Sequence, residues 1–376
     1  MKKRDLIIII PFLAFIFTFG LLYFFIPDVE FSENENKYLD QLPKVSLKNI
    51  MNGKFESDFE AYMSDQIAGR DFWMSCNTAL LLASGKNDVN GVYVGKDGYL
   101  LEIFDGLDFD RYEKQIDALN KFNSYVDVPV YFVIAPNSVS VHEDKLPDYA
   151  VNYSQDKYIG DFYDGLDSDI VSIDVSSVLK DHSEEYIYYR TDHHWTTYGS
   201  FIAFNEIARV MGIRTLSLDE VAVTDVSADF LGTFFSKGNF IIDPDVIQRF
   251  DVKNGASYKV ILDGGVESDT LYDDSYLLKK DKYAYFTHGN PAHLSVETES
   301  DSDKTLVIVK DSYMHCMLQF FVPSYKKIHM VDPRYIKTNL TEYITDLEPD
   351  EILILYNAKT LSDEVNFTRL GTAPKN

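Results

Sequence analysis

The sequence from Leu306 to Tyr313 reads LVIVKDSY, four aliphatic residues followed directly by Lys-Asp-Ser-Tyr. A short apolar run without polar alternation is typical of a strand buried on both faces of a parallel sheet. The apolar residues that follow predict a helix through Phe321. Ser312 would then lie at a strand-to-helix turn, where its hydroxyl projects above the carboxyl end of the sheet and its backbone N–H can stabilise negative charge.

Strands and helices alternate over most of the chain. Apolar runs predict further strands at 130–134, 170–173, 327–331 and 351–356, and apolar residues at helical spacing predict helices over 109–126 and 197–211. This alternation favours an α/β fold with a mostly parallel sheet covered by helices on both faces. Residues 213–303 interrupt it with strand-like runs at 260–262 and 283–286, and we interpret them as a β-rich insertion or lid within the same domain.

The N-terminal end predicts a membrane segment. Residues 6–26 carry no charge and follow the basic residues 2–4, and about 20 apolar residues span a bilayer core. We expect an uncleaved single-pass anchor with a cytoplasmic N-terminus. A cleaved signal peptide is the alternative, although no Ala-x-Ala follows the apolar run. The predicted organisation is a basic end and anchor over 1–27, a polar linker over 28–52, and one extracellular domain over 53–376.

The composition excludes several classes of protein. The 376 residues include 35 Lys and Arg against 60 Asp and Glu, which gives a formal net charge of −25. A chain this acidic is not expected to bind nucleic acid, or to bind an anionic membrane through a basic patch. Its two cysteines, Cys76 and Cys316, cannot form a disulfide scaffold or a multi-cysteine zinc module. We interpret both as buried, small hydrophobic residues.

A second motif with chemical potential lies at residues 190–196, which read RTDHHWT. The Asp-x-His spacing places Asp192 and His194 on the same side of an extended turn, whereas His193 would point away. With Ser312, these residues supply the nucleophile, the base and the orienting carboxylate of acyl transfer. Because His194 acts as a base only when neutral, we expect activity to fall as the pH drops through a pKa near about 6.5.

Each motif also has a simpler interpretation. A serine that follows an aspartate at a helix start is often only a cap, and an Asp-His-His run could bind a metal. One such run cannot wrap all its ligands around a single ion without help, so we predict neither a metal nor another cofactor. Asn137, after the predicted strand 130–134, could donate to an oxyanion or simply form a Pro-Asn turn. The further candidates for oxyanion or substrate contact are Arg190, His193 and Tyr313.

These motifs together resemble a known family. Residues 192–195 read DHHW, the motif that names the DHHW proteins, which in turn resemble the exported SGNH-hydrolase-like proteins of alginate O-acetylation (the J and X types). The shared pattern is a P-K/N segment after a strand, then D-T-H-W, then G-D-S. Pro136-Asn137, Asp192-x-His194-Trp195 and Asp311-Ser312 follow that order here. Upstream, residues 65–70 and 95–100 resemble the lead-in of the family, and the similarity covers about residues 32–357.

The resemblance implies an SGNH-like fold with Ser312, His194 and Asp192 as a triad that transfers acetyl groups to hydroxyls of an extracellular polysaccharide. It also implies a partner, a multi-pass membrane acyltransferase that moves acetyl across the bilayer. Two departures bear on catalytic efficiency: Lys310 replaces the usual glycine before Asp-Ser, and His193 replaces the usual threonine. Three functions stay open: a polysaccharide O-acetyltransferase, a carbohydrate acetylesterase with the same triad, and a non-catalytic surface scaffold with the same fold.

Overall fold

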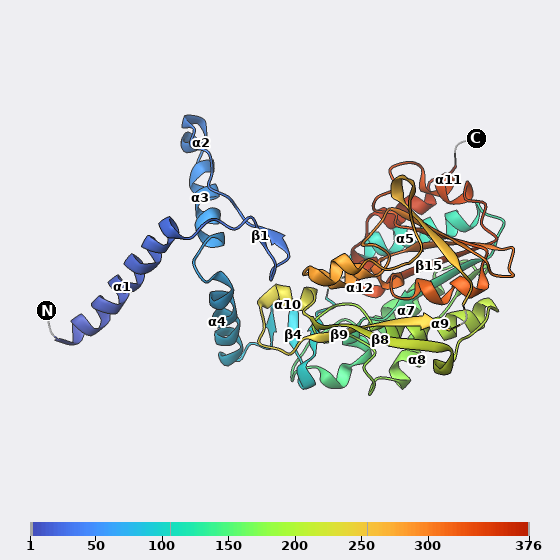
Figure 1. Cartoon of the computed structure of the whole chain (residues 1–376), viewed down its shortest axis with the longest axis horizontal. Coiled ribbons are helices and arrows are strands. Elements are labelled where there is room, and N and C mark those ends of the chain that lie inside the picture. Colours follow the sequence, from blue (N-terminus) through green and yellow to red (C-terminus); the bar gives the residue numbers. More distant parts are fainter. Residues whose placement is uncertain (1–2, 106, 254, 375–376) are drawn as a thin grey trace. The chain divides into compact units, whose positions relative to one another are not determined.

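The computed structural model describes residues 3–105, 107–253 and 255–374 (Figure 1). The chain divides into two compact units, which comprise residues 1–90 with 235–241, and residues 91–234 with 242–376. The N-terminal unit contains α1 (Lys3–Phe25), β1 (Phe31–Ser32), β2 (Lys37–Tyr38), α2 (Leu47–Met51), α3 (Lys54–Asp65) and α4 (Arg70–Ala83). Helix α1 is long and apolar enough to cross a membrane.

Short elements and ion pairs order the segment that the sequence predicts to be a linker. Residues 28–52 contain β1, β2 and α2. Beside them, Arg70 forms ion pairs with Glu35 at 2.5 Å and with Asp65 at 3.1 Å. Asp65 also pairs with Lys37 at 3.2 Å. These ion pairs therefore tie the β1–β2 hairpin to the start of α4.

The larger unit, residues 91–234 with 242–376, is built on an eight-stranded sheet of order β11-β10-β12-β14-β13-β15-β6-β7. The strands are β6 (Val130–Ala135), β7 (Ile170–Ser172), β10 (Tyr258–Leu262), β11 (Val266–Ser268), β12 (His293–Thr298), β13 (Thr305–Lys310), β14 (Lys327–Val331) and β15 (Glu351–Asn357). Strands β14, β13, β15, β6 and β7 run parallel, and β12, β10 and β11 extend the sheet in antiparallel pairs. The predicted mostly parallel α/β fold is confirmed.

Side chains alternate between two hydrophobic cores, one on each face of the sheet. On β15, Leu353 and Leu355 join the core that includes α9, whereas Ile352 and Ile354 join the core that includes α5. The first face is covered by α8 (Ser176–Asp181) and α9 (Thr197–Met211), and the second by α5 (Phe109–Asn123), α7 (Gln155–Asp164), α11 (Leu340–Thr345) and α12 (Ala358–Asp363). Burial on both faces explains why these strands show no polar alternation.

The segment 213–303 is partly integrated into this sheet. It supplies β10, β11 and β12, and it also forms a separate antiparallel pair, β8 (Val221–Phe230) with β9 (Asp245–Val252). The predicted strand at 283–286 is wrong, because residues 282–285 form a 3₁₀ turn. Tyr283 and Tyr285 are nevertheless both buried in the core.

The predicted helix after Ser312 is also wrong. Three 3₁₀ turns replace it, at Ser312–Met314, Leu318–Phe320 and Val322–Ser324. Almost every side chain of this segment is buried, so its apolar residues reflect complete enclosure and not one face of a helix. Pro323 lacks a backbone N–H and prevents a regular α-helix from continuing.

Candidate active site

The sheet topology places Ser312 beside the ends of two neighbouring strands. Strands β13, β15 and β6 are adjacent and parallel, so their carboxyl ends meet at one edge of the sheet. Asp311 accepts hydrogen bonds at 2.7 Å from both the backbone and the side-chain amide of Asn357, at the end of β15. It also accepts from the backbone N–H of Tyr313 at 2.9 Å. Asp311 therefore fixes the turn that carries Ser312, although burial raises its pKa to about 6.

The buried carboxylate of Asp245 fixes the turn that carries the histidines. One oxygen of this buried carboxylate accepts from the backbone N–H of Arg190 at 2.9 Å and from the hydroxyl of Tyr186 at 2.5 Å. The other accepts from the backbone N–H and the hydroxyl of Thr191, at 2.8 Å and 2.6 Å. Four donors thus compensate the burial of Asp245 and fix the backbone just before Asp192.

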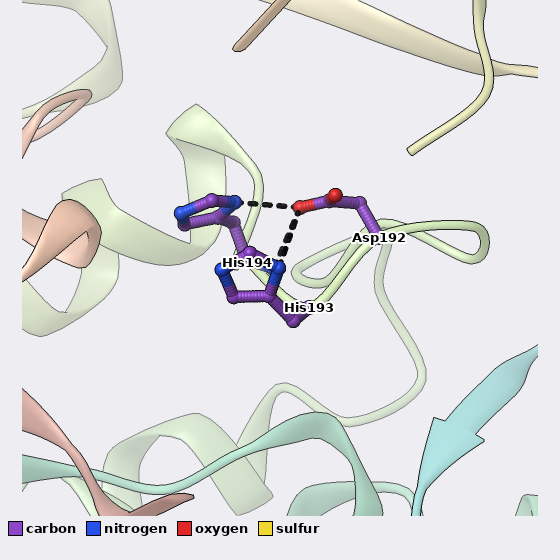
Figure 2. Close-up of side chains that lie close together, drawn as sticks. All are labelled: Asp192, His193 and His194. Carbon is purple, nitrogen blue, oxygen red and sulfur yellow. Dashed lines mark hydrogen bonds and ion pairs between the residues drawn. The ribbon is translucent and has the colours of Figure 1, made fainter. Parts of the chain in front are cut away.

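Ser312, His194 and Asp192 lie in a hydrogen-bonded line. The Oγ of Ser312 is 2.7 Å from Nε2 of His194, and Nδ1 of His194 is 2.6 Å from Oδ1 of Asp192 (Figure 2 shows the Asp–His contact). A carboxylate can only accept, so Nδ1 carries the proton and Nε2 is free to accept one from the serine. The structure thus brings together the three residues that the sequence nominates as nucleophile, base and orienting carboxylate.

Asp192 is enclosed by a close backbone approach. Its Oδ2 accepts from the backbone N–H of Thr233 at 2.8 Å and from the Thr233 hydroxyl at 3.0 Å. Gly232 packs so tightly that a methyl group in place of its hydrogen would overlap the Asp192 side chain. Burial raises the pKa of Asp192, but His193, His194 and the hydrogen bonds from His194 and Thr233 outweigh it and hold that pKa well below its usual range.

His194 is buried, and its basicity differs from the sequence-based expectation. Burial lowers the pKa of His194 to about 4; neighbouring His193 adds to this effect, and Asp192 opposes it. The expected pKa near 6.5 is therefore wrong for this environment, because the charged imidazole loses its hydration on burial. At neutral and mildly acidic pH His194 is neutral, as a general base must be.

His193 does not point away from the other two residues of its motif. Its ring centre lies 3.8 Å from that of His194, and its Nδ1 lies 3.6 Å from Asp192 Oδ1 and 2.7 Å from Thr233 Oγ1. Figure 2 shows both imidazoles facing the same carboxylate. The physical reason is that residues 190–194 form bends instead of an extended strand, so the alternation of side chains assumed from the sequence does not hold.

The Asp-His-His cluster also satisfies the simplest geometric requirement for a metal. One ligand atom from each of Asp192, His193 and His194 lies within 4.8 Å of the other two. However, both ring nitrogens of His194 face protein partners, Asp192 on one side and Ser312 on the other. This arrangement suits proton transfer between serine and carboxylate-bound histidine better than ligation of an ion.

Two other predicted residues brace the site. The hydroxyl of Tyr313 donates to the backbone carbonyl of His193 and accepts from Nδ2 of Asn137 at 3.1 Å. The same Asn137 amide donates to Asn357 at 3.0 Å. Both hydrogens of the Asn137 amide are engaged, so an oxyanion role would require one of these bonds to break. Trp195 donates from its ring to the backbone carbonyl of Tyr313 at 2.9 Å.

The side chain of Arg190, the remaining candidate, lies against two tyrosine rings. The guanidinium carbon lies 5.6 Å from the ring centre of Tyr99 and 5.3 Å from that of Tyr186, the geometry of cation–π contacts. The structure therefore shows Arg190 packed between aromatic rings, and substrate contact by this residue stays a prediction.

Lys310, which replaces the usual glycine, is fully buried with 0 % exposure. Its ammonium group lies 2.7 Å from Asn290 Oδ1, 2.8 Å from His315 Nε2 and 3.1 Å from Asp332 Oδ2. Burial lowers the pKa of Lys310 to about 8, and Asp332 opposes the shift. The side chain is thus directed to its own polar cluster, in which all three ammonium hydrogens have acceptors.

The sequence motifs miss several residues that position the triad. Tyr283 stacks on the His194 ring at 3.6 Å between centres, and its hydroxyl donates to the backbone carbonyl of Ser312 at 3.2 Å. Gly232, Thr233 and Asp245 come from the same segment as Tyr283, residues 213–303. The segment predicted as an insertion or lid therefore supplies the supports of Asp192 and His194. Its residues form no local motif, so the sequence carries no signal for these contacts.

The cysteines do not pair. Cys76 and Cys316 are both free thiols. Cys316 is buried, as predicted from its apolar surroundings, whereas the prediction of a buried Cys76 is wrong, because Cys76 is partly exposed. The Sγ of Cys316 lies 3.3 Å from the hydroxyl oxygen of Tyr283, and the same hydroxyl contacts the backbone carbonyl of Ser312.

Comparison with known proteins places the chain in a family. The DHHW protein family matches residues 92–331, which is more than half of the chain. The crystal structure of a DHHW family protein from Eubacterium siraeum is similar, with a TM-score of 0.66 at 21% identity over 77% of this chain and 98% of that one. Bacillus cereus PatB1 gives a TM-score of 0.62 at 20% identity over 72% of this chain and 97% of that one.

A third similar structure is the O-acetyltransferase domain of Pseudomonas putida AlgJ, with a TM-score of 0.46 at 12% identity over 73% of this chain and 93% of that one. A search of curated proteins gave no match. At these identities the matches to the Eubacterium siraeum protein and to PatB1 establish the fold, and the family match confirms the resemblance carried by residues 192–195. The chain belongs to the DHHW family.

Proposed function

We propose that this chain is an exported, membrane-anchored O-acetyltransferase that acetylates hydroxyls of a cell-surface or secreted polysaccharide through an acetyl-Ser312 intermediate. The observation that carries the proposal is the line of hydrogen bonds from Ser312 through His194 to Asp192, with lengths of 2.7 Å and 2.6 Å. These lengths are within the range for proton transfer between a nucleophile and its base. The likeness of the fold to PatB1 is consistent with the proposal.

In the first half-reaction, Ser312 Oγ attacks the carbonyl carbon of the acetyl donor while His194 Nε2 accepts the serine proton. The carbonyl oxygen becomes an oxyanion. Among the described residues, no acceptor binds the backbone N–H of Ser312, so this group is available to stabilise that charge. The leaving group departs with the proton from His194, and the serine keeps the acetyl group as an ester.

In the second half-reaction, a sugar hydroxyl attacks the acetyl-serine carbonyl and transfers its proton to His194. Collapse of the second oxyanion returns that proton to Ser312 Oγ and leaves the acetyl ester on the sugar. Water in place of the sugar would give an acetylesterase with the same triad, which is the second candidate function. A buried, fully connected triad argues against the third candidate, a scaffold without catalysis.

The proposed setting follows from α1 and from the family resemblance. Helix α1 is long and apolar enough to span a bilayer, and we propose that it stays attached as an anchor with the larger unit outside the cell. The acetyl donor would be presented by a multi-pass membrane acyltransferase, and the acceptor would be a glycan of the cell envelope.

The test is detection of the acyl-enzyme. The full chain in nanodiscs is incubated with p-nitrophenyl acetate, and intact mass with peptide mapping locates the acetyl group. We expect acetyl on Ser312, and none there in Ser312→Ala or His194→Ala. The matched control is His182→Ala, because His182 is a partly exposed histidine whose ring pairs with Glu185 at 2.6 Å. Acetylation that persists in His194→Ala would contradict the assigned base.

A second probe and an acceptor series separate the candidate functions. A sulfonyl fluoride should modify the same serine, and Bacillus cereus PatB1 has been solved with a sulfonyl adduct. Release of p-nitrophenol that accelerates with a carbohydrate acceptor supports the transferase. Release that is unaffected by any acceptor supports the esterase. A chain that reacts with neither probe would support the scaffold.

A further inference from the structure

The short helix α2 lies in a segment whose charge is opposite to that of the chain. Residues 44–54 read KVSLKNIMNGK, with three lysines and no acidic residue, in a chain of formal net charge −25. The whole-chain charge argued against contact with an anionic membrane. The local charge does not, because electrostatic attraction to a surface acts within about 10 Å, the Debye length.

The apolar residues of this helix are exposed together on one face. Leu47, Ile50 and Met51 are 81 %, 52 % and 87 % exposed, and their i, i+3, i+4 spacing aligns them along the helix. The side chain of Ser46 caps the helix by accepting from the backbone N–H of Asn49 at 3.1 Å. The helix is therefore specified locally although none of its residues is buried, which is unusual for an amphipathic helix in a globular domain.

Two lysines beside this face have no acidic partner among the described residues. Lys44 and Lys48 form no ion pair with any residue that the structure describes, whereas Lys54 pairs with Asp58 at 3.2 Å. An occupant that satisfies both the apolar face and the lysines must combine hydrocarbon with negative charge. The boundary between headgroups and acyl chains of an anionic bilayer has that combination.

The position of α2 in the chain brings it to such a boundary. Helix α1 ends at Phe25, and residues 26–46 connect it to α2. A fully extended connection of this length reaches at most roughly 70 Å, and the β1–β2 hairpin folds part of it back on itself. A membrane that holds α1 therefore presents headgroups to α2 at a high effective concentration.

We propose that Lys44, Val45, Leu47, Lys48, Ile50 and Met51, here called the α2 patch, form a second membrane contact. The apolar side chains enter the headgroup–acyl boundary of the outer surface, and the two lysines bind anionic lipid phosphates. The inference rests on the proposed anchor and export. It implies that an otherwise acidic protein is held against the bilayer, on the side where a membrane-borne acetyl donor would be presented.

The experiment places a fluorescent reporter in the patch of the full chain. Met51→Cys in a Cys76→Ser background is labelled with an NBD group; Cys316 is buried and does not compete. The labelled chain is reconstituted in nanodiscs of phosphatidylcholine alone or with phosphatidylglycerol, each with and without doxyl-labelled lipid. The control label is at Tyr149→Cys, a site in the larger unit that is 96 % exposed.

We expect blue-shifted NBD emission and doxyl quenching at position 51 in the anionic discs, with neither at position 149. Lys44→Gln with Lys48→Gln should reduce the ratio of buried to exposed label by about 25-fold, at about five-fold per lysine. Lys114→Gln with Lys337→Gln, which changes the net charge equally, should have no effect.

Three outcomes would overturn the proposal. In the first, position 51 stays as solvated as position 149 in anionic discs. In the second, quenching is the same without phosphatidylglycerol and is insensitive to the lysine substitutions. In the third, the label is shielded but not quenched by doxyl lipid, which would indicate a second copy of the chain or another protein on the patch. Failure of the anchor itself is distinguishable, because the chain would then not co-elute with the discs.

Discussion

Gly232 offers a sharp test of whether the position of Asp192 controls catalysis. An added methyl group at Gly232 would lie 2.6 Å from Cγ of Asp192 and closer still to its Cβ and Oδ2. Ordinary contact for such a methyl begins at 3.4 Å. The substitution Gly232→Ala must therefore widen these contacts by 3.4 − 2.2 = 1.2 Å at Cβ and by 3.4 − 2.6 = 0.8 Å at Cγ.

The displacement sets the expected loss of activity. Asp192 receives a 2.6 Å hydrogen bond from His194, and a shift of almost 1 Å breaks or badly bends such a bond. Misplacement of a catalytic group by about 1 Å costs about 100-fold in rate, which corresponds to about 2.7 kcal/mol of activation free energy. We expect Gly232→Ala to slow acetylation of Ser312 by about this factor.

The assay is stopped-flow release of p-nitrophenol from p-nitrophenyl acetate, with urea unfolding measured on the same samples. The matched control is Gly160→Ala in α7, where an added methyl meets no atom within 4 Å. This control should keep full activity and gain about 0.5–1 kcal/mol in the free energy of unfolding. Full activity in a folded Gly232→Ala protein would refute the reasoning, because Asp192 could then move without consequence.

Three further predictions concern protonation and buried charge. The acetylation rate should fall partly near pH 6, where Asp311 becomes protonated and holds the Ser312 turn less firmly, and should show a final acid limb through about pH 4, because burial lowers the pKa of His194 to about 4 and protonated His194 cannot accept the serine proton; a profile without a limb near 4 would contradict this environment of His194. His193→Gln should move that acid limb to higher pH, since a neighbour that lowers the pKa of His194 is removed, and an unchanged profile would exclude the coupling. Lys310→Met should lower the free energy of unfolding by about 1–3 kcal/mol in urea titrations, because Asn290 and the buried His315 lose their donor while Asp332 keeps its ion pair with Arg334; stability equal to that of the native chain would show that these two side chains need no such donor.

The central strands could be predicted because their burial leaves a simple pattern. The predicted strand 327–331 and helix 197–211 coincide with β14 and α9. A strand covered on both faces has no polar positions, and a helix on a sheet has one apolar stripe, so each type of burial has its own periodicity. The 312–324 segment shows the limit of this reasoning, since a chain enclosed on all sides is apolar throughout and has no period that distinguishes a helix from 3₁₀ turns.

The residues of the triad could be nominated because they sit in two short motifs, but their supports could not. Thr233 contacts Asp192 from 41 residues away along the chain, and Asp245 contacts Arg190 from 55 residues away. Nothing in the local sequence marks either residue. The pKa of His194 was also beyond reach, because it depends on burial and on the position of His193. That position follows from backbone bends at residues 190–194 that the spacing alone does not reveal.

The low basicity of His194 shifts the catalytic work toward Asp192. A neutral imidazole in this site is ready to accept a proton at any pH above about 4, but burial makes the resulting imidazolium costly. The proposed reaction passes through that cation, so a neighbouring group must stabilise the imidazolium when the serine attacks. Asp192 keeps its negative charge despite burial, because two backbone N–H groups and the hydroxyl of Thr233 all donate to it. A carboxylate fixed in this way carries little reorganisation cost, which explains the close packing of Gly232 and Thr233 against Asp192.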